Sequence, residues 1–504
     1  MGIGTLLIRA DASPAIGTGH VMRCIALAQA WQDAGGQTVF TMAQSTEAIR
    51  ARIRAESFET LPISSSVSTS DDLLQTIALL QQQHCEWIAV DGYQFGMDYQ
   101  SGLKAAGFKV LFLDDFGHSH HYSADIVLNQ NVSATPALYS NRGEYTRLIL
   151  GPRYALLRRE FSIWSNWQRT FSPSCRHLLV TMGGSDEENV TATAIEALHL
   201  AGIPELEATV IVGGSNPNFA KLQNLVARSG RKIVVRKDVS NIAELMAGAD
   251  VAISAAGTAC WELCLLGLPA LLIDVADNQT ALAEELQKRA CAIHVGNRMV
   301  RPETIAEKLK SLIESLERRQ LLSKASRELV DGRGAMRVVS VLCGQRLLRL
   351  RPVRNEDRRL LWEWANDPDV RAASFTSDPI EWETHVSWFD AKMEDSCGTT
   401  KICRMFIAED GEGIAVGQIR FERRADAEWD VGISLSKDMR GRGFASELIE
   451  RGVRELRKLD VGSLIHACVK PENIASVKAF EGACFENCGT EQILGQAAVH
   501  LIYR

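Results

Sequence analysis

The sequence predicts an α/β protein with two doubly wound, Rossmann-like domains followed by a smaller α/β domain of another kind. Short apolar strands alternate with amphipathic helices as far as about residue 345, which is typical of parallel sheets covered by helices on both faces. The pattern restarts after a polar, aromatic passage at 153–173, and it changes to an antiparallel one near residue 347. A chain of 504 residues has room for about three domains. We expect them at 1–152, 153–345 and 346–504.

The composition is that of an ordinary globular protein, with 46% hydrophobic and 23% charged residues. The formal net charge of −7, without long basic runs, argues against a nucleic-acid surface. No apolar stretch reaches the length of a membrane span, and the first residues lack the features of a signal peptide. We therefore expect a cytoplasmic protein without nucleic-acid or membrane partners, as a monomer or a small homo-oligomer.

The twelve cysteines are scattered singly, without a C-x-x-C pair or a cluster at zinc spacing. Cys24, Cys260, Cys264 and Cys343 lie in apolar helical patterns, so we expect them to be reduced and buried. No metal site is predicted.

Strands are expected wherever four to six apolar residues stand between turn signals. In the first domain these are Thr5–Ala10, Thr38–Met42, Trp87–Asp91, Val110–Leu113, Ile126–Leu128 and Leu148–Leu150. In the second they are His177–Met182, Ala208–Val212, Lys232–Val235, Val251–Ser254, Ala270–Ile273 and Ala292–Val295. Ligands of such sheets bind at the carboxyl ends of the strands.

The most informative segment follows the first strand, where Gly17-Thr18-Gly19-His20 opens an amphipathic helix. A strand, a glycine turn and a helix present free backbone N–H groups to an anion. The helix dipole favours the neutral imidazole, so His20 can accept a proton. The alternative is a histidine that only caps the helix. Arg23, one turn further, can pair with a phosphate or serve as a structural partner of Asp11.

In the second domain the densest group of small residues is Ser254-Ala255-Ala256-Gly257-Thr258, followed by Glu262 one turn into a helix. Gly257 lets a diphosphate approach, Thr258 can cap the helix, and Glu262 can accept hydrogen bonds from ribose hydroxyls. In the other interpretation Glu262 only complements the helix dipole.

Three further segments support a nucleotide site in this domain. Gly183-Gly184-Ser185 forms a second glycine turn, and Val239 precedes a helix that can offer backbone groups to a base. Asn278 opens a helix that we expect to point into the cleft, and it can also be the N-cap of that helix.

Together these residues resemble the sugar-nucleotide hydrolases of pseudaminic acid biosynthesis, which have the two-domain glycosyltransferase-B fold. The resemblance covers about 345 residues. The motifs that carry it are Gly17-x-Gly19-His20-x-x-Arg23-Cys24, Asp91-x-Tyr93, Asp114-Asp115, Gly183-Gly184-Ser185-Asp186, Gly257-Thr258 with Trp261-Glu262, Asp277-Asn278-Gln279 and Asp331-Gly332-x-Gly334-Ala335.

This resemblance implies metal-independent cleavage of UDP-2,4-diacetamido-2,4,6-trideoxy-β-L-altropyranose to UDP and the free sugar, with inversion at the anomeric carbon. It implies that His20 is the base that activates water. Tyr93 and Asn278 would hold the sugar and the diphosphate region, and Glu262 would hold the ribose. Asp11, Gly17, Gly19, Arg23, Gly184, Ser185, Val239, Gly257 and Thr258 complete the expected substrate site.

The last third begins with a strand at Arg351 and a helix at Glu356–Asn366, followed by antiparallel strands at Met405–Glu409, Ala415–Arg423 and Trp429–Leu435. Next comes Arg440-Gly441-Arg442-Gly443-Phe444-Ala445 and an amphipathic helix through Leu459. Free amides at a glycine-rich helix start, with arginines beside them, suit a pyrophosphate. A plain glycine turn is the alternative.

This segment resembles the GCN5-related N-acetyltransferases (GNAT), in which Arg440-x-x-Gly443-x-Ala445 would bind acetyl-CoA. Asn473, in a later helix, would contact the cofactor, and the strand Ile433–Leu435 would splay open to bind the pantetheine arm. Many members carry a tyrosine seven residues after that asparagine as the acid for the thiolate, whereas this chain has Phe480. Glu428 and Asp430 are candidate bases for the amine, and both can equally be solvated side chains.

The resemblances together imply a bifunctional enzyme that acetylates the 4-amino group of a UDP-4-amino-4,6-dideoxy sugar and then releases UDP. Acetyl-CoA and the UDP-amino sugar are the expected small-molecule partners. One alternative is a glycosyltransferase with an accessory acetyltransferase, and another is a sugar-nucleotide-binding scaffold with an inactive GNAT domain.

Overall fold

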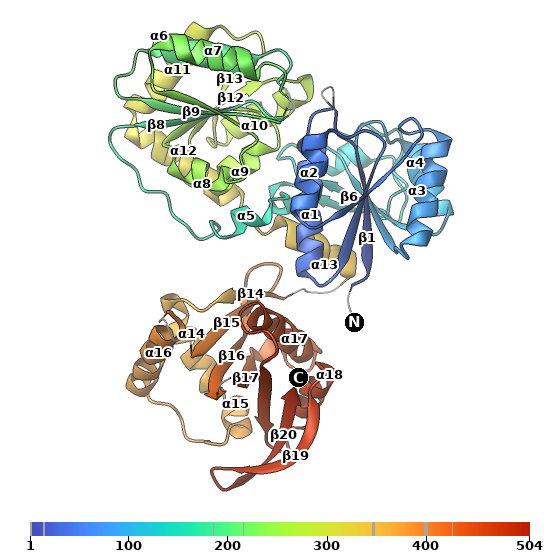
Figure 1. The fold of residues 1–504 in the computed structure, drawn as a ribbon, viewed down its shortest axis with the longest axis vertical. Coiled ribbons are helices and arrows are strands. Elements are labelled where there is room, and N and C mark those ends of the chain that lie inside the picture. The colour runs from blue at the N-terminus through green and yellow to red at the C-terminus, as the bar shows by residue number, and fades with distance from the viewer. Residues whose placement is uncertain are drawn as a thin grey trace. The chain divides into compact units, whose positions relative to one another are not determined.

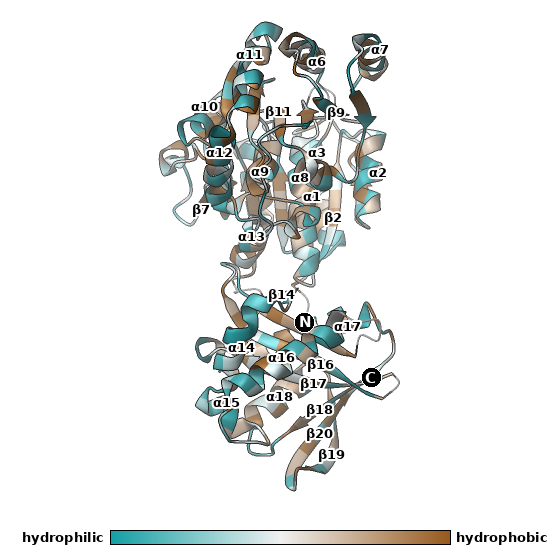
Figure 2. Ribbon diagram, turned by 90° about the vertical axis from the view of Figure 1, so that its left-hand side faces the viewer, coloured by the Kyte–Doolittle hydropathy of each residue, from teal (hydrophilic) through white to brown (hydrophobic). Residues whose placement is uncertain are grey.

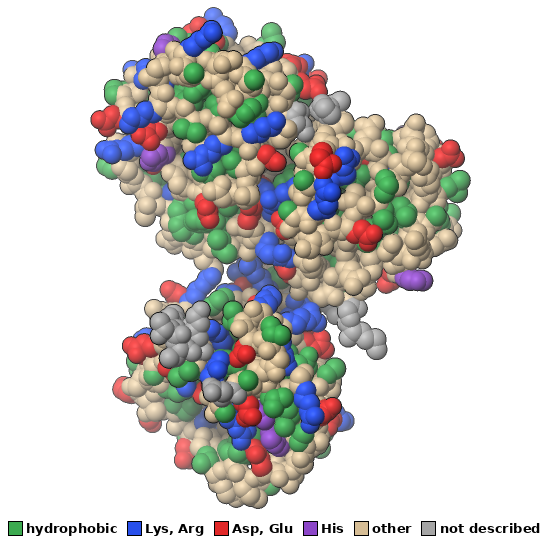
Figure 3. Space-filling view, viewed as in Figure 1, with side chains coloured by type: hydrophobic (Ala, Val, Ile, Leu, Met, Phe, Trp, Pro, Cys, Tyr) green, Lys and Arg blue, Asp and Glu red, His purple; other side chains and the backbone are tan. Residues whose placement is uncertain are grey.

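The computed structural model describes residues 3–13, 16–184, 186–214, 216–344, 348–397, 402–425 and 427–504. The chain divides into two units, Met1–Gln345 and Arg346–Arg504, and each is described by itself. On the face of each unit that Figure 3 shows, lysine and arginine side chains are interspersed with acidic ones.

The first lobe of the N-terminal unit is a parallel sheet of seven strands in the order β3-β2-β1-β4-β5-β6-β7. Its strands are β1 (Thr5–Ala10), β2 (Gln37–Met42), β3 (Glu59–Pro62), β4 (Trp87–Asp91), β5 (Lys109–Leu113), β6 (Ile126–Asn129) and β7 (Arg147–Leu150). Its helices are α1 (Gly19–Asp33), α2 (Glu47–Ala55), α3 (Ser70–Gln82) and α4 (Met97–Ala105), and 3-10 turns are at Pro136–Tyr139 and Pro152–Tyr154. In Figure 1, α1 and α2 cover one face of the sheet, and α3 and α4 cover the other.

The second lobe repeats the same topology, with six parallel strands in the order β10-β9-β8-β11-β12-β13. Its strands are β8 (His177–Thr181), β9 (Glu207–Val212), β10 (Ile233–Lys237), β11 (Val251–Ala255), β12 (Ala270–Asp274) and β13 (Ile293–Asn297). Its helices are α5 (Arg159–Ser162), α6 (Val190–Ala201), α7 (Phe219–Ser229), α8 (Ile242–Gly248), α9 (Ala259–Leu265), α10 (Thr280–Lys288), α11 (Pro302–Glu314), α12 (Leu316–Leu329) and α13 (Gly334–Cys343). Helix α13, inside the range 153–345 expected for the second domain, packs against α1 of the first lobe.

Both lobes therefore have a topological switch point, where consecutive connections leave the sheet in opposite directions. It lies between β1 and β4 in the first lobe and between β8 and β11 in the second. Ligands of doubly wound sheets bind outside the carboxyl ends of the strands at this point. His20 follows β1 and Asp91 ends β4, so both side chains start from the first of these positions.

The C-terminal unit is a mixed sheet of seven strands in the order β14-β15-β16-β17-β18-β20-β19. Its strands are β14 (Arg349–Pro352), β15 (Cys403–Glu409), β16 (Ala415–Ala425), β17 (Glu428–Leu435), β18 (Leu464–Val469), β19 (Glu486–Ile493) and β20 (Gln496–Tyr503). Its helices are α14 (Arg358–Ala365), α15 (Pro368–Ala373), α16 (Trp382–Cys397), α17 (Phe444–Arg457) and α18 (Ile474–Gly482). The helix expected at Glu356–Asn366 begins as a 3-10 turn at Asn355–Asp357 and continues as α14.

The only parallel pair of this sheet in the described residues, β17 with β18, is in register over three residues and ends at Asp430 opposite His466. Beyond that point β17 pairs only with β16, for example Ile433 with Ile419. The two strands therefore diverge toward their carboxyl ends, as the splayed GNAT strand requires.

The strands carry the apolar cores, which Figure 2 shows as brown ribbons beside the largely teal helices of the surface. In the C-terminal unit, Trp429 and Ile465 pack with α17 and α18 on one face, while Phe389 of α16 packs on the other. Every cysteine whose side chain the structure describes is a free thiol. Cys24, Cys260 and Cys264 are buried as expected, whereas Cys343, near the end of α13, is only half-buried. Over the same residues, no helix is long and apolar enough to cross a bilayer.

Candidate active sites

The candidate base of the N-terminal unit is held by a carboxylate that the sheet positions. His20 Nδ1 lies 2.6 Å from Asp91 Oδ1. Asp91 is fully buried at the end of β4, and His20 is 9% exposed in the first turn of α1. A carboxylate on Nδ1 favours the tautomer with the proton on that nitrogen and leaves Nε2 as the proton acceptor. His20 thus does not act as a capping histidine.

Arg23 holds this pair in place rather than facing solvent. Its Nε and Nη2 lie 2.6 and 2.7 Å from the two oxygens of Asp91, and its Nη1 lies 2.7 Å from Asp115 Oδ1. With all three nitrogens engaged and 4% of its surface exposed, Arg23 has no group directed at a phosphate. The structural partners of Arg23 are therefore Asp91 and Asp115, and not Asp11 as in the alternative drawn from the sequence.

The charge balance of the cluster keeps Asp91 ionised. Burial opposes ionisation of this carboxyl, but the charge of Arg23 and the hydrogen bonds from Arg23 and His20 outweigh burial and hold its pKa well below the usual range. An ionised Asp91 stabilises an imidazolium at His20, which is the state of the ring after it takes a proton.

A chain of hydrogen bonds joins this cluster to the second lobe. Tyr93 donates to Asp115 Oδ2 over 2.7 Å, and Asn278 Nδ2 donates to the Tyr93 hydroxyl over 2.9 Å. The Tyr93 ring packs edge-on against His20, with centroids 4.8 Å apart. Burial and the charge of Asp115 raise the pKa of Tyr93, so the phenol stays protonated. Asn278 lies in a 3-10 turn and is not the N-cap of α10, which is Gln279.

Asp11 lies inside the first lobe, which differs from the expectation that it contacts substrate. Its Oδ1 is 2.9 Å from Arg9 Nη1 and accepts from the backbone N–H groups of Ala43 and Gln44. Its Oδ2 accepts from Gln94, and the residue is 1% exposed. The carboxylate therefore ties β1 to the end of β2.

The glycine turns of the two lobes approach each other closely. A Cβ on Gly184 would lie 2.2 Å from Thr18 Oγ1, and one on Gly19 would lie 3.5 Å from Thr258 Oγ1. Gly17 has a φ of +79°, a conformation that glycine adopts without strain. The turn that carries His20 therefore faces the turns expected to bind UDP.

One carboxylate oxygen of Glu262 accepts a hydrogen bond within the protein, and the other does not. Its Oε1 accepts from Arg158 Nη2 over 2.8 Å, and Arg158 also pairs with Glu160. Within the described residues, Glu262 Oε2 accepts no hydrogen bond, so it is available to a hydroxyl. Thr258 is the N-cap of α9 without a side-chain bond to the helix, so its predicted cap is not formed.

The remaining UDP-binding candidates are less informative. Gly257 follows β11 and has the Gln279 amide 3.5 Å from the position of a Cβ. Val239 lies between β10 and α8 and packs against the second-lobe core. Ser185 lies outside the described residues.

In the C-terminal unit, the predicted pyrophosphate loop has a backbone that only glycine adopts readily. Gly441 and Gly443 have φ values of +72° and +83°, and no atom lies within 4 Å of a Cβ built on either. Gly443 is the N-cap of α17, and Ala445 is in its first turn. The Arg440 side chain was expected to bind the pyrophosphate of acetyl-CoA. In the structure it binds Asp367 (2.8 Å), Asp369 (2.9 Å) and the carbonyl of Leu435 (3.1 Å) instead.

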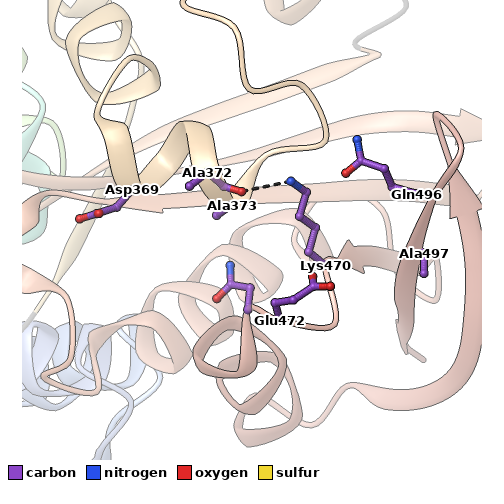
Figure 4. A pocket seen from close by; sticks show the side chains of 8 residues that line it. Asp369, Ala372, Ala373, Lys470, Glu472, Gln496 and Ala497 are labelled. Carbon is purple, nitrogen blue, oxygen red and sulfur yellow. Dashed lines mark hydrogen bonds between the residues drawn. The ribbon is translucent and has the colours of Figure 1, made fainter.

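A cavity of about 710 Å³ lies between α15, the turn that follows β18 and the start of β20. Figure 4 shows Lys470 crossing it to donate to the carbonyl of Ala372 over 3.1 Å. Asn473 lines the cavity as the N-cap of α18, where its side chain accepts from the Ser476 N–H. The predicted cofactor residues Asn473 and Ile433 thus lie at the same end of the sheet.

Phe480 is a core residue, 3% exposed and edge-on to Phe485. Nothing in its position offers a proton to a thiolate. The candidate bases Glu428 and Asp430 lie on the sheet face opposite α17 and α18, because the residues that alternate with them belong to the core under those helices. Burial raises the pKa of Asp430.

Among the described residues, the group suited to holding a metal ion is Cys468, Glu491 and His500, whose ligand atoms lie within 4.8 Å of one another. No metal was expected from the sequence, and Cys468 donates to Glu491 Oε1 over 2.7 Å. That bond and burial raise the pKa of the thiol to about 12.

Three partner residues of these sites were not assigned a role from the sequence. Asp91 and Asp115 belong to motifs of the hydrolase resemblance, but their contacts with Arg23 and His20 depend on the order of the strands. No sequence pattern indicated that Arg158 would bind Glu262. Asp91 ends the buried strand β4 and Asp115 follows the adjacent buried strand β5 by two residues, a pattern that could have indicated the first two.

Two family models match the chain. Residues 177–335 match the glycosyltransferase family 28 C-terminal domain, and residues 347–486 match the acetyltransferase (GNAT) domain. An uncharacterized protein of Methanocaldococcus jannaschii is 21% identical over 95% of this chain and 96% of its own length.

Two further relatives have descriptive names. The spore coat polysaccharide biosynthesis protein SpsG of Bacillus subtilis is 28% identical over 46% of this chain and 68% of its own. The UDP-2,4-diacetamido-2,4,6-trideoxy-β-L-altropyranose hydrolase of Campylobacter jejuni is 26% identical over 56% of this chain and 96% of its own. The chain is therefore a fusion of a glycosyltransferase-B-like, sugar-nucleotide-processing part with a GNAT acetyltransferase domain.

Proposed function

We propose that the N-terminal unit hydrolyses a UDP-linked diacetamido sugar and that the C-terminal unit uses acetyl-CoA to make the 4-acetamido group of that sugar. The observation that best supports hydrolysis is the His20–Asp91 pair, which faces the glycine turns of the second lobe. In this pair His20 Nδ1 lies 2.6 Å from Asp91 Oδ1. The Campylobacter relative bears the name of this hydrolase, which supports the same reaction.

In this mechanism Nε2 of His20 takes a proton from a water molecule as the water attacks the anomeric carbon. The C–O bond to UDP breaks, and the sugar leaves with a new hydroxyl of inverted configuration. UDP is a good leaving group, so backbone amides of the glycine turns suffice to stabilise its charge. Asp91 stays ionised and stabilises the imidazolium, while Tyr93 and Asn278 orient the sugar.

The acetylated sugar is the better substrate for hydrolysis on electrostatic grounds. A free 4-amine is cationic near neutrality, and this charge opposes the positive charge that develops at the anomeric carbon. Amide formation removes it. Acetylation before hydrolysis is therefore the expected order.

The test is UDP release by the His20→Ala variant from the UDP-diacetamido sugar in buffer without an acceptor. We expect a loss of ~10²–10⁴-fold in kcat, with UDP affinity and acetyl transfer nearly unchanged. His118→Ala is the matched control, because this histidine also binds a buried aspartate, Asp114, in the same lobe. Unchanged hydrolysis by His20→Ala would refute the role.

The same assay separates the hydrolase from a glycosyltransferase, the function that the family 28 model would favour. A hydrolase releases UDP and free sugar in buffer alone, and mass spectrometry identifies both. If the wild-type protein released UDP only when an acceptor was added, the glycosyltransferase alternative would replace the hydrolase.

A further inference from the structure

Three side chains with metal-binding atoms come together on the face of the C-terminal sheet opposite α17 and α18. They come from β18, β20 and β19, which are consecutive strands of this sheet (Figure 2). Cys468 of β18 lies directly opposite His500 of β20, and Glu491 of β19 lies opposite Ala498, two residues before His500. Alternate residues of a strand share a face, so the three side chains project from the same side of the sheet.

The distances within this group suit a single small cation. The ligand atoms of Cys468, Glu491 and His500 all lie within 4.8 Å of one another, and His500 Nδ1 lies 3.8 Å from Glu491 Oε2. Bond lengths of about 2.0–2.3 Å in a tetrahedral zinc site put neighbouring ligand atoms about 3.3–3.8 Å apart. The thiol of Cys468 is closer to Glu491, 2.7 Å from Oε1, because a hydrogen bond that an ion would replace joins the two groups.

A buried imidazole nitrogen without a partner lies next to this group. His466 is 7% exposed, and its Nδ1 lies 3.0 Å from His500 Nε2. Its Nε2 forms no hydrogen bond with any residue that the structure describes, and Glu428 Oε2 lies 3.5 Å from it. A buried polar atom without a partner is costly, so the arrangement of the two rings needs an explanation.

The two rings cannot satisfy both of their outer nitrogens while they are neutral and alone. Each neutral imidazole has one N–H group, and one of the two is used between the rings. If His466 donates to His500, the lone pair on Nε2 of His466 faces the Glu428 carboxylate. If His500 donates to His466, the lone pair on Nδ1 of His500 faces the Glu491 carboxylate.

A cation bound to His500 Nδ1 removes this conflict. His500 then carries its proton on Nε2 and donates to His466, and His466 donates from its own Nε2 toward Glu428. Histidines that bind metals typically donate their other ring N–H to such a partner, which fixes the tautomer and the ring orientation. A proton on His500 Nδ1 would satisfy the rings equally, and the adjacent thiol of Cys468 is what favours a metal.

The charges around the group also favour a cation. Within the described residues, neither Glu428 nor Glu491 forms an ion pair with a lysine or an arginine. Arg424 is the positive charge that acts on Glu491, but it pairs with Asp430 over 3.4 Å. The carboxylates of Glu428 and Glu491 are therefore left to balance a bound ion.

We propose that Cys468, Glu491 and His500 bind a zinc ion, and that His466 is a positioning residue that orients His500. A thiolate, an imidazole and a carboxylate are zinc ligands, whereas Mg²⁺ and Ca²⁺ take oxygen ligands. The thiol releases its proton to solvent when the ion binds. Three protein ligands leave the fourth position to water, which reaches the site because the side chains of His500 and Glu491 are 19% and 26% exposed.

The ion would hold the last strands of the chain together. β19 is the edge strand of the sheet, and none of its residues is fully buried, so little apolar packing holds it. A zinc ion ties β19 to β18, a strand with which it does not pair. This role is independent of the proposed acetyl transfer and goes beyond it.

The first test is a titration of the full-length protein with Co²⁺ after treatment with a chelator and desalting. The wild type should bind one equivalent and show the thiolate-to-cobalt charge-transfer band, which Zn²⁺ then removes. Cys468→Ser should lose this band, while the hydroxyl keeps the hydrogen bond to Glu491. The control is Cys488→Ser, an exposed cysteine of β19, which should keep the band. No band in the wild type, or an equal band in Cys468→Ser, overturns the site.

The second test measures the role of His466. Zinc affinity, determined by competition with a chelator, should fall by ~10–100-fold in His466→Gln, while the cobalt band keeps its position because the ligands are unchanged. His385→Gln is the control, a buried histidine of α16 that should leave the affinity unchanged. Equal affinities in the two variants refute the orienting role.

A third measurement tests whether the ion supports the fold. Zinc at about a hundredfold excess over its Kd should raise the Tm of the wild type by about 5 °C or more. Cys468→Ser, with its fold verified by circular dichroism, should show no rise, and Cys488→Ser should respond as the wild type does. If zinc raises the Tm of Cys468→Ser equally, the ion binds elsewhere and the proposal is wrong.

Discussion

Each unit has a buried histidine, His20 in the first turn of α1 and His466 within β18, but the two rings are held in different ways. His20 is bound directly to a buried carboxylate that is itself held by Arg23. His466 is bound to another imidazole, and its carboxylate is one residue further away. The direct contact stabilises an imidazolium, whereas the indirect one mainly sets the tautomer.

The difference follows from sheet architecture. In a parallel sheet the carboxyl ends of adjacent strands meet at one edge, so Asp91 of β4 reaches a helix that follows β1. In the mixed sheet of the C-terminal unit, cross-strand neighbours meet on a face, and their side chains lie in a row. We expect variants in the site around His20 to show larger effects on turnover, because the Asp91 carboxylate binds both His20 and Arg23 there.

The largest effect should come from Asp91→Asn. An amide cannot carry the negative charge and can present a donor to His20, so hydrolysis should fall by ~10³–10⁴-fold. Asp72→Asn is the matched control. Asp72 also accepts two hydrogen bonds from a buried arginine, Arg9, over 2.8 and 3.1 Å, but it does not contact His20. Both variants should lose stability, and only Asp91→Asn should lose turnover. Equal turnover in the two would show that the direct contact is structural.

The next effect should come from Gly443→Leu, which tests whether the two sites work independently. A side chain at φ +83° strains the backbone and fills the open side of the loop, so acetyl-CoA affinity by calorimetry should fall at least about tenfold. Gly462→Leu is the control, with a φ of +84° and similarly open space outside the loop. Hydrolysis of supplied diacetamido substrate should continue in both. Normal cofactor binding by Gly443→Leu would place acetyl-CoA elsewhere.

A smaller effect, on UDP affinity, is expected for Glu262→Gln. This variant distinguishes a residue that only binds the nucleotide from residues, such as His20, that take part in the reaction. Loss of one charged hydrogen bond to the ribose should weaken UDP binding by about two- to tenfold with little change in kcat. Glu160→Gln is the control, because Glu160 also pairs with Arg158. If both variants weaken UDP equally, Glu262 acts through Arg158 and does not touch the ribose.

The smallest effect concerns acid stability. The pKa of Asp91 is held well below that of an unfolded aspartate, so its contribution to stability is present above about pH 3.9 and is lost as the pH falls below it. Urea unfolding at several pH values should therefore show a shallower acid slope in Asp91→Asn, by up to about 1.4 kcal/mol per pH unit. Identical slopes would mean that the pKa of Asp91 is the same in the folded protein as in the unfolded chain.

Much of the fold was predictable because parallel strands are continuous apolar runs. The twelve strands expected in the N-terminal unit all form, with small shifts such as Ile233–Lys237 in place of Lys232–Val235. Strand β3 escaped notice because none of its residues is fully buried, so its apolar signal is weak. No strand was expected after Leu435, so β18, β19 and β20 were all missed; exposure accounts for β19 but not for β18, which is largely buried.

By itself the sequence determined the local elements: the glycine turns, the helices that follow them and the histidine of the first turn. These depend on backbone conformation and hydrophobic period, which neighbouring residues set. Only the tertiary structure decided the partners. Arg23 lies 68 residues before Asp91, Asn278 lies 185 residues after Tyr93, and His466 lies 34 before His500. Strand order brings these side chains together, and no local pattern encodes the distance between two residues so far apart in the chain.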